Sequence, residues 1–197
     1  MKQKHTLPGA TRRRPRTASV ILTVILACLL ISNMAVIFLF SAANGAESGK
    51  TSAGVTRFLL ETFYAPYDDL PSAEQEAILH STHKFVRKAA HFCEFALLGF
   101  LSAGLLLWVS ARKRAMKAWK TWLYPAAFTL LYAVSDEVHQ MFTDRGPRVT
   151  DVLIDFAGAC FGILLIHGLA WLVNRRRKGK HRSKEGRDTS CETPDTN

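Results

Sequence analysis

The stretch YAVSDEVHQMFTDRGPRVTDVLIDFAG, residues 132–158, decides how the rest of the chain is interpreted. It lies between two apolar runs and is rich in polar side chains, namely Asp136, Glu137, His139, Gln140, Arg145, Arg148, Asp151 and Asp155. Ionisable groups beside helices of membrane-spanning length are costly and usually have a function. The stretch therefore predicts a functional cluster where one membrane helix ends and the next begins.

The chain of 197 residues is short enough for a single domain. Hydrophobic residues make up 48% of it and gather in four long runs separated by charged connectors. This alternation is typical of a polytopic membrane protein. We expect an all-α fold, a bundle of four transmembrane helices, with spans at about residues 19–42, 89–109, 121–141 and 152–173. The last three spans form a core at residues 89–174.

The segments outside the spans differ in character. Residues 1–18 form a basic tail, and residues 175–197 form a second basic tail whose lack of apolar periodicity predicts disorder. Residues 43–88 make a longer connector with an apolar patch suited to the membrane surface, and Ser72 predicts the start of a helix leading into the second span. A cleavable signal peptide is the alternative for residues 19–42. The run exceeds the usual signal core of roughly 7–15 residues, which favours an uncleaved anchor.

The basic residues indicate topology rather than nucleic-acid binding. The net charge is +10, but Lys and Arg flank the apolar runs and form no aromatic-studded surface. By the positive-inside rule, the two tails and the basic connector at residues 110–120 lie in the cytoplasm. Residues 43–88 are then extracytoplasmic, and the polar ends of the last three spans share the outer leaflet. The four cysteines include no C-x-x-C pair, so neither a disulfide framework nor a zinc knuckle is indicated.

The polar residues of each of the last three spans share one helical face, at steps of three or four. These faces consist of Arg87, His91 and Glu94; Asp136, His139 and Gln140; and Arg148, Asp151 and Asp155. The third face continues into Gly158 and Gly162, small residues that let helices approach closely. We expect the three faces to meet at one site.

Three interpretations of this site remain open. Carboxylates and arginines could pair only to hold the bundle together, with Asp151 and Asp155 favouring the start of their helix. The pairs His91–Glu94 and Glu137–His139 supply ligand types that zinc accepts, although they match no known zinc spacing. Basic side chains at headgroup level could bind a phosphate, with a histidine as acid–base; these are Arg87, Arg145 and Arg148.

Two segments resemble signature blocks of the VanZ-like family of small bacterial membrane proteins, named for a member linked to teicoplanin resistance. They are RKAAHFCEFALLGF at residues 87–100 and SDEVHQMFTDRGPRVTDVLIDFAG at residues 135–158, and the resemblance covers roughly residues 57–173. The family pattern marks Lys88, His91, Glu94, Gly99, Asp136, Glu137, His139, Gln140, Phe142, Arg145, Gly146, Arg148, Asp151, Asp155 and Gly158. The chain departs from this pattern in the loop around Pro147 and at Phe156, where family members often carry Asn or Thr.

The resemblance implies a multi-pass protein of the bacterial plasma membrane that influences teicoplanin-type glycopeptide susceptibility through a polar outer-leaflet site. The alternative is a membrane-embedded enzyme acting on a phosphorylated lipid or lipid-linked wall precursor. The candidate catalytic residues are His91, Glu94, Asp136, Glu137, His139 and Asp155. The candidate binding residues are Arg87, Lys88, Gln140, Arg145, Arg148 and Asp151. No cofactor and no metal is assigned; the expected partners are membrane lipids and a lipid-linked envelope component, not nucleic acid.

Overall fold

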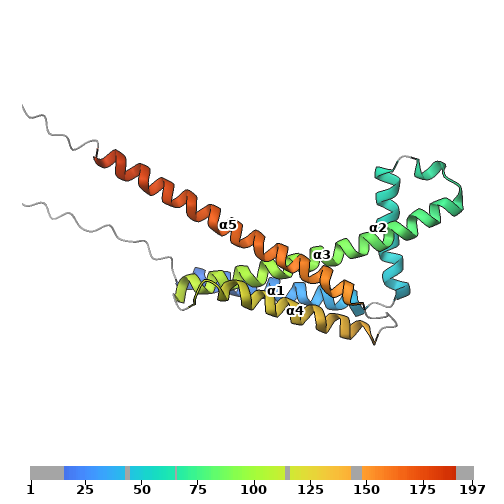
Figure 1. Ribbon diagram of the computed structural model, residues 1–197, viewed down its shortest axis with the longest axis horizontal. Coiled ribbons are helices and arrows are strands. Elements are labelled where there is room, and N and C mark those ends of the chain that lie inside the picture. Colours follow the sequence, from blue (N-terminus) through green and yellow to red (C-terminus); the bar gives the residue numbers. More distant parts are fainter. Residues whose placement is uncertain (1–15, 43–44, 65, 114–115, 143–147, 190–197) are drawn as a thin grey trace, which may run out of the picture.

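The computed structural model describes residues 16–42, 45–64, 66–113, 116–142 and 148–189 (Figure 1). Every secondary-structure element among these residues is a helix, and no strand occurs among them. The all-α prediction is therefore confirmed for this part of the chain. The elements in chain order are α1 (Arg16–Ala42), α2 (Gly45–Phe63), the short 3-10 helix η1 (Tyr67–Asp69), α3 (Ser72–Lys113), α4 (Lys120–Gln140) and α5 (Val149–Thr189).

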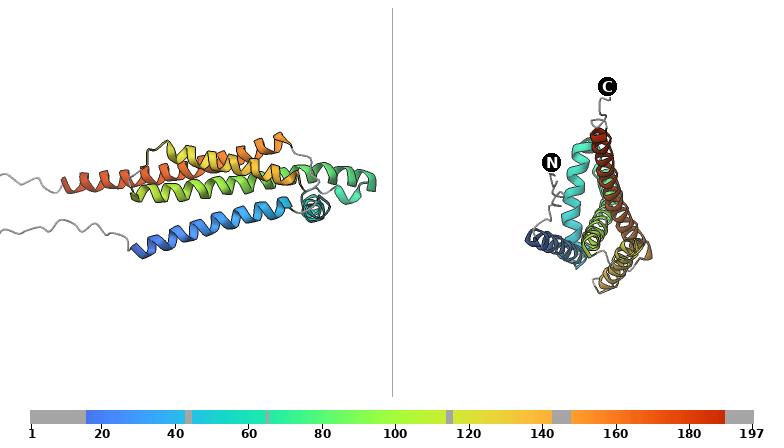
Figure 2. Two further views of the ribbon diagram at one scale, coloured as in Figure 1. Left: turned by 90° about the horizontal axis from the view of Figure 1, so that it is seen from below. Right: turned by 90° about the vertical axis from the view of Figure 1, so that its left-hand side faces the viewer.

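Four of these helices run along one long axis, and α2 crosses that axis (Figures 1 and 2). The helix α1 lies beside α3 and α4, and α5 lies beside α3 and α4. The last turns of α1 and α4 and the first turns of α5 lie at the same end of the bundle, close to α2 (Figure 1). This arrangement brings the end of the third predicted span next to the start of the fourth.

Three of the described helices are long and apolar enough to cross a membrane: Thr17–Ala42, Ser72–Arg112 and Val149–Arg177. The third predicted span, at residues 121–141, is present as α4, which has 21 residues, a length close to the ~20 that a crossing needs. It does not reach the apolar character of the other three because it contains Lys120, Asp136 and Glu137. By length and composition, three of the described helices are candidate membrane spans, and the predicted number of four is not confirmed.

The helix α3 begins at Ser72, as predicted, and has 42 residues. At 1.5 Å per residue it is roughly 63 Å long, about twice the hydrocarbon thickness of a bilayer. Its first half extends past the end of α4, on the same side as α2 (Figure 1). The first turns of α3 therefore lie outside the bundle.

A small apolar core joins the four long helices. It consists of the fully buried residues Ile37, Phe95, Leu98, Ala133 and Ala159, one or two from each helix. Tyr132 packs its ring 6.1 Å from that of Phe95 and donates a hydrogen bond of 2.7 Å to the backbone oxygen of Met34. In contrast, most large apolar side chains of α1 are exposed on the bundle's outer surface, as expected for a helix that faces lipid.

Glycines bring α3 and α5 into backbone contact. A side chain at Gly158 would collide with the backbone carbonyl of Phe92, and one at Gly162 would collide with that of Ala96. A side chain at Gly99 would collide in the same way with Ala159 on α5. Only hydrogen fits at these positions, so the small residues predicted on the fourth span do set a close helix crossing.

The second basic tail differs from its prediction of disorder. The helix α5 continues beyond the apolar run to Thr189, so residues 175–189 are helical; residues 190–197 and 1–15 lie outside the described residues. The physical reason is that Lys, Arg and Glu have good helix propensity, and a helix already formed by the apolar segment extends without a new nucleation cost. Gly179 and Gly186 weaken it without ending it.

Candidate functional site

A small polar pocket lies at the end of the bundle where α4 ends and α5 begins. It is lined by Arg87, Lys88 and His91 from α3, Gln140 from α4, and Asp151, Ile154 and Asp155 from α5. Six of these seven residues are sequence-predicted site residues. The pocket is small and partly open to the outside of the bundle.

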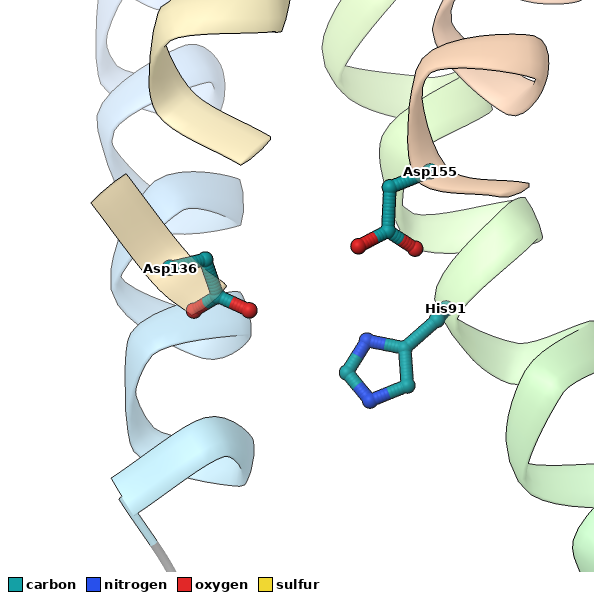
Figure 3. Close-up of side chains that lie close together, drawn as sticks. All are labelled: His91, Asp136 and Asp155. Atoms are coloured by element: carbon teal, nitrogen blue, oxygen red, sulfur yellow. The ribbon is translucent and has the colours of Figure 1, made fainter. Parts of the chain in front are cut away.

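Three side chains from three helices converge at this end of the bundle (Figure 3). A ring nitrogen of His91, a carboxylate oxygen of Asp136 and one of Asp155 all lie within 4.8 Å of one another. Both aspartates are buried, with 4% of Asp136 and 3% of Asp155 exposed. One imidazole and two carboxylates at this separation can exchange protons with a bound group or share a cation.

The Asp136 carboxylate is held by hydrogen bonds from two helices. Ser41 on α1 donates from Oγ to Oδ2 of Asp136 over 2.7 Å, and Gln140 donates from Nε2 to the same oxygen over 2.9 Å. Gln140 also lies 3.3 Å from the Ser41 hydroxyl. Two donors on one oxygen fix the orientation of the carboxylate and leave Oδ1 directed away from them.

An ion pair and a histidine–carboxylate contact adjoin the converging groups. Lys88 Nζ lies 3.2 Å from Asp151 Oδ1 across the α3–α5 interface, and His91 Nδ1 lies 3.7 Å from Glu94 Oε2 within α3. The Lys88 side chain is 41% exposed, so its pair contributes less than about 1 kcal/mol to stability. The pair with Asp151 nevertheless holds the Lys88 ammonium group at the pocket, which Arg87 also lines.

Glu137 and Arg148 have a different arrangement from the one predicted. The backbone N–H of Arg148 donates a hydrogen bond to Oε1 of Glu137 at the start of α5. A carboxylate in this position satisfies a backbone donor and favours the positive end of the helix dipole. Neither residue lines the pocket, and the Arg148 side chain is exposed. The geometry gives Glu137 a structural role in joining α4 to α5.

His139 also lies outside the pocket lining. Its ring stacks on Phe38 of α1, with 4.5 Å between ring centroids, and its Nε2 is buried without a hydrogen-bond partner among the described residues. Glu94 lies next to the pocket through its pair with His91. Arg145, a predicted binding residue, lies outside the described residues.

Sequence reasoning missed the contribution of α1. Ser41 holds Asp136, and Asn33 donates from Nδ2 to the backbone oxygen of Glu94 over 3.3 Å. A signal was present, because Asn33, Ile37 and Ser41 occur at steps of four and are all buried on one face of an otherwise lipid-exposed helix. Two polar residues on one stripe of an apolar run mark the face that turns toward other helices.

The sequence model of the VanZ/LLP1 family matches residues 22–172 of the chain. The match begins earlier than the predicted resemblance at residue 57 and includes most of α1, which agrees with the contacts that α1 makes at the site. No curated protein and no solved structure shows a significant match to the chain.

Proposed function

Since the chain belongs to the VanZ/LLP1 family, we propose that its polar pocket binds a phosphorylated, lipid-linked component of the bacterial cell envelope. Occupation of the pocket would lower the access of teicoplanin-type glycopeptides to their target and so change susceptibility. The observation that carries this proposal is the pocket itself, which presents Arg87 and Lys88 beside an imidazole at one end of a membrane bundle.

We place the pocket at the outer leaflet of the plasma membrane. The first turn of α1 and the last turns of α5 lie at the end opposite the pocket (Figure 1). Both are basic or adjoin basic segments, which favours a cytoplasmic position for that end. In this topology α4 also crosses the membrane, which brings the number of spans to four. Its polar residues face the other helices, with Thr129, Asp136 and Gln140 all buried.

The helix α2 supports the same placement. It crosses the bundle axis near the pocket (Figures 1 and 2), and it exposes Val55, Phe58 and Phe63. An amphipathic helix with exposed aromatic residues is suited to lie in the plane of the membrane interface. Such a helix would keep the pocket at the depth of lipid phosphates, where Arg87 can bind phosphate oxygens through a planar, two-pronged guanidinium.

The test compares susceptibility to teicoplanin in cells that produce the protein and cells that do not, with production verified by immunoblot. We expect a shift in the inhibitory concentration that Arg87→Gln and Lys88→Gln both reduce. Lys84→Gln is the matched control, because Lys84 lies one turn before Lys88, is exposed, and does not line the pocket. Equal susceptibility with and without the protein would contradict the proposal, and so would equal effects of Lys84→Gln and Lys88→Gln.

Catalysis is the second candidate function, and the convergence of His91 with two aspartates favours it. An imidazole beside carboxylates is the usual arrangement for general acid–base chemistry on a phosphoryl group. The two functions are separated by incubating the purified protein with a lipid pyrophosphate. Turnover that His91→Gln abolishes would favour an enzyme, whereas saturable binding without product would favour a binding protein.

A further inference from the structure

Asp155 is a buried acidic side chain of the pocket that lacks a bonding partner among the described residues. Only 3% of the residue's surface is exposed, yet no described residue forms a hydrogen bond or an ion pair with its carboxylate. Figure 3 shows this carboxylate pointing toward His91, with Asp136 directed at the same place from α4. A buried carboxylate without a partner is costly, so a group that would neutralise it is expected there.

The charge on the converging groups points to a cation. Among the described residues, Asp136 accepts hydrogen bonds only from the neutral groups of Ser41 and Gln140, and neither aspartate forms an ion pair with a cationic side chain there. Two negative charges therefore face one imidazole in a buried region. A divalent cation would balance both carboxylates while using a neutral imidazole as a ligand.

The distances agree with a shared ion. The three candidate ligand atoms lie within 4.8 Å of one another. Tetrahedral ligands that bind one zinc ion at about 2.0–2.2 Å are roughly 3.3–3.6 Å apart, so side-chain movements of up to about 1 Å would complete the site. We infer that His91, Asp136 and Asp155 bind one divalent transition-metal ion between α3, α4 and α5.

The surroundings have the features of a metal site. The hydrogen bonds from Ser41 and Gln140 orient the Asp136 carboxylate, and Glu94 lies 3.7 Å from His91 Nδ1. Groups that hold the ligands in place in this way tune metal affinity. His91 and Asp155 also line the open pocket, which supplies an entry path and free positions for solvent or a ligand oxygen.

The ligand set selects among cations. An imidazole nitrogen with carboxylate oxygens suits Zn²⁺ or Mn²⁺, whereas Mg²⁺ prefers an all-oxygen environment with several waters. We therefore expect Zn²⁺ and Mn²⁺ to bind more tightly than Mg²⁺. This inference concerns the proposed ligand pocket but requires no lipid ligand, so it can fail or succeed independently of the function proposed above.

The experiment uses the full chain, purified in lipid nanodiscs with a tag free of histidine. The protein is stripped with a chelator, titrated separately with Zn²⁺ and with Mn²⁺, and analysed by calorimetry and by metal mass spectrometry. We expect one ion per chain. Asp155→Asn and His91→Gln should weaken binding at least about 100-fold, and Ser41→Ala, which removes an orienting hydrogen bond, about 10–100-fold. Electron paramagnetic resonance of bound Mn²⁺ should show coupling to one imidazole nitrogen.

The matched control is Glu137→Gln. It neutralises a buried carboxylate adjacent to Asp136 but retains an acceptor for the Arg148 N–H, so metal binding should remain. Melting in chelator should show Asp155→Asn at least as stable as the parent, because it removes a buried unpaired charge. Absence of metal binding by the parent chain would overturn the inference, as would equal binding by Asp155→Asn and Glu137→Gln. Metal binding without any effect on glycopeptide susceptibility would leave the cation site standing and reject the function.

Discussion

The two halves of the α3–α5 interface follow opposite packing principles. Around Gly158 and Gly162 the two backbones touch through small residues and need no polar group. One turn nearer to the start of α5, the half-buried His91 and the buried Asp155 face each other with polar groups. The first region gives the helices a fixed separation, and the second uses that separation to hold functional groups apart at a defined distance. The polar pocket is therefore positioned by an apolar contact next to it.

The largest expected effect comes from breaking the close contact. Gly158→Val would place a side chain against the backbone of Phe92, which cannot move without separating α3 from α5. We expect a loss of about 3 kcal/mol or more in stability, at the upper end of overpacking effects, together with loss of the pocket. Thermal melting and protein abundance in the membrane measure it. Gly168→Val is the control, since open space surrounds Gly168; similar losses at both positions would show that the contact is not tight.

A loss of stability of intermediate size is expected when Asp136, in the polar region of the interface, is replaced. Asp136→Ala would leave the buried donors of Ser41 and Gln140 without their acceptor, at a cost of about 1–3 kcal/mol. Asp136→Asn keeps an acceptor oxygen and should be nearly as stable as the parent, while removing the charge that the site uses. Chemical denaturation in nanodiscs would compare the two variants. Equal destabilisation by both substitutions would mean that the charge itself holds the bundle together.

The smallest effect is expected at the rim of the pocket. A double-mutant cycle of Lys88→Gln and Asp151→Asn isolates the energy of their ion pair. We expect a coupling of less than about 1 kcal/mol because the Lys88 side chain is 41% exposed. The coupling should fall further in high salt, which screens exposed charges. A coupling of several kcal/mol, insensitive to salt, would place this pair among the groups that fix the helix crossing.

The apolar patterning was sufficient to predict the long helices, since α1, α3, α4 and α5 cover the four apolar runs. The spacing of Gly158 and Gly162 likewise predicted a close helix approach, and the structure identifies α3 as the partner. The individual roles of the polar residues could not be predicted from the sequence. Helical spacing shows which residues share a face of a helix, but not which neighbouring helix that face contacts. Glu137 and His139 belong to the same polar segment as Asp136, yet one contacts the start of α5 and the other stacks on α1. Ser41 was missed because its importance depends on a partner 95 residues away.

The separation of 95 residues between Ser41 and Asp136 affects the order in which contacts form during synthesis. At 5–20 residues per second, the ribosome completes Asp136 roughly 5–20 seconds after Ser41. During this interval α1 is already made, but its Ser41 hydroxyl lacks the carboxylate that it contacts in the finished molecule. The hydrogen bond that orients Asp136 therefore forms late in synthesis, and it requires that α1 still lie beside α4 when Asp136 arrives.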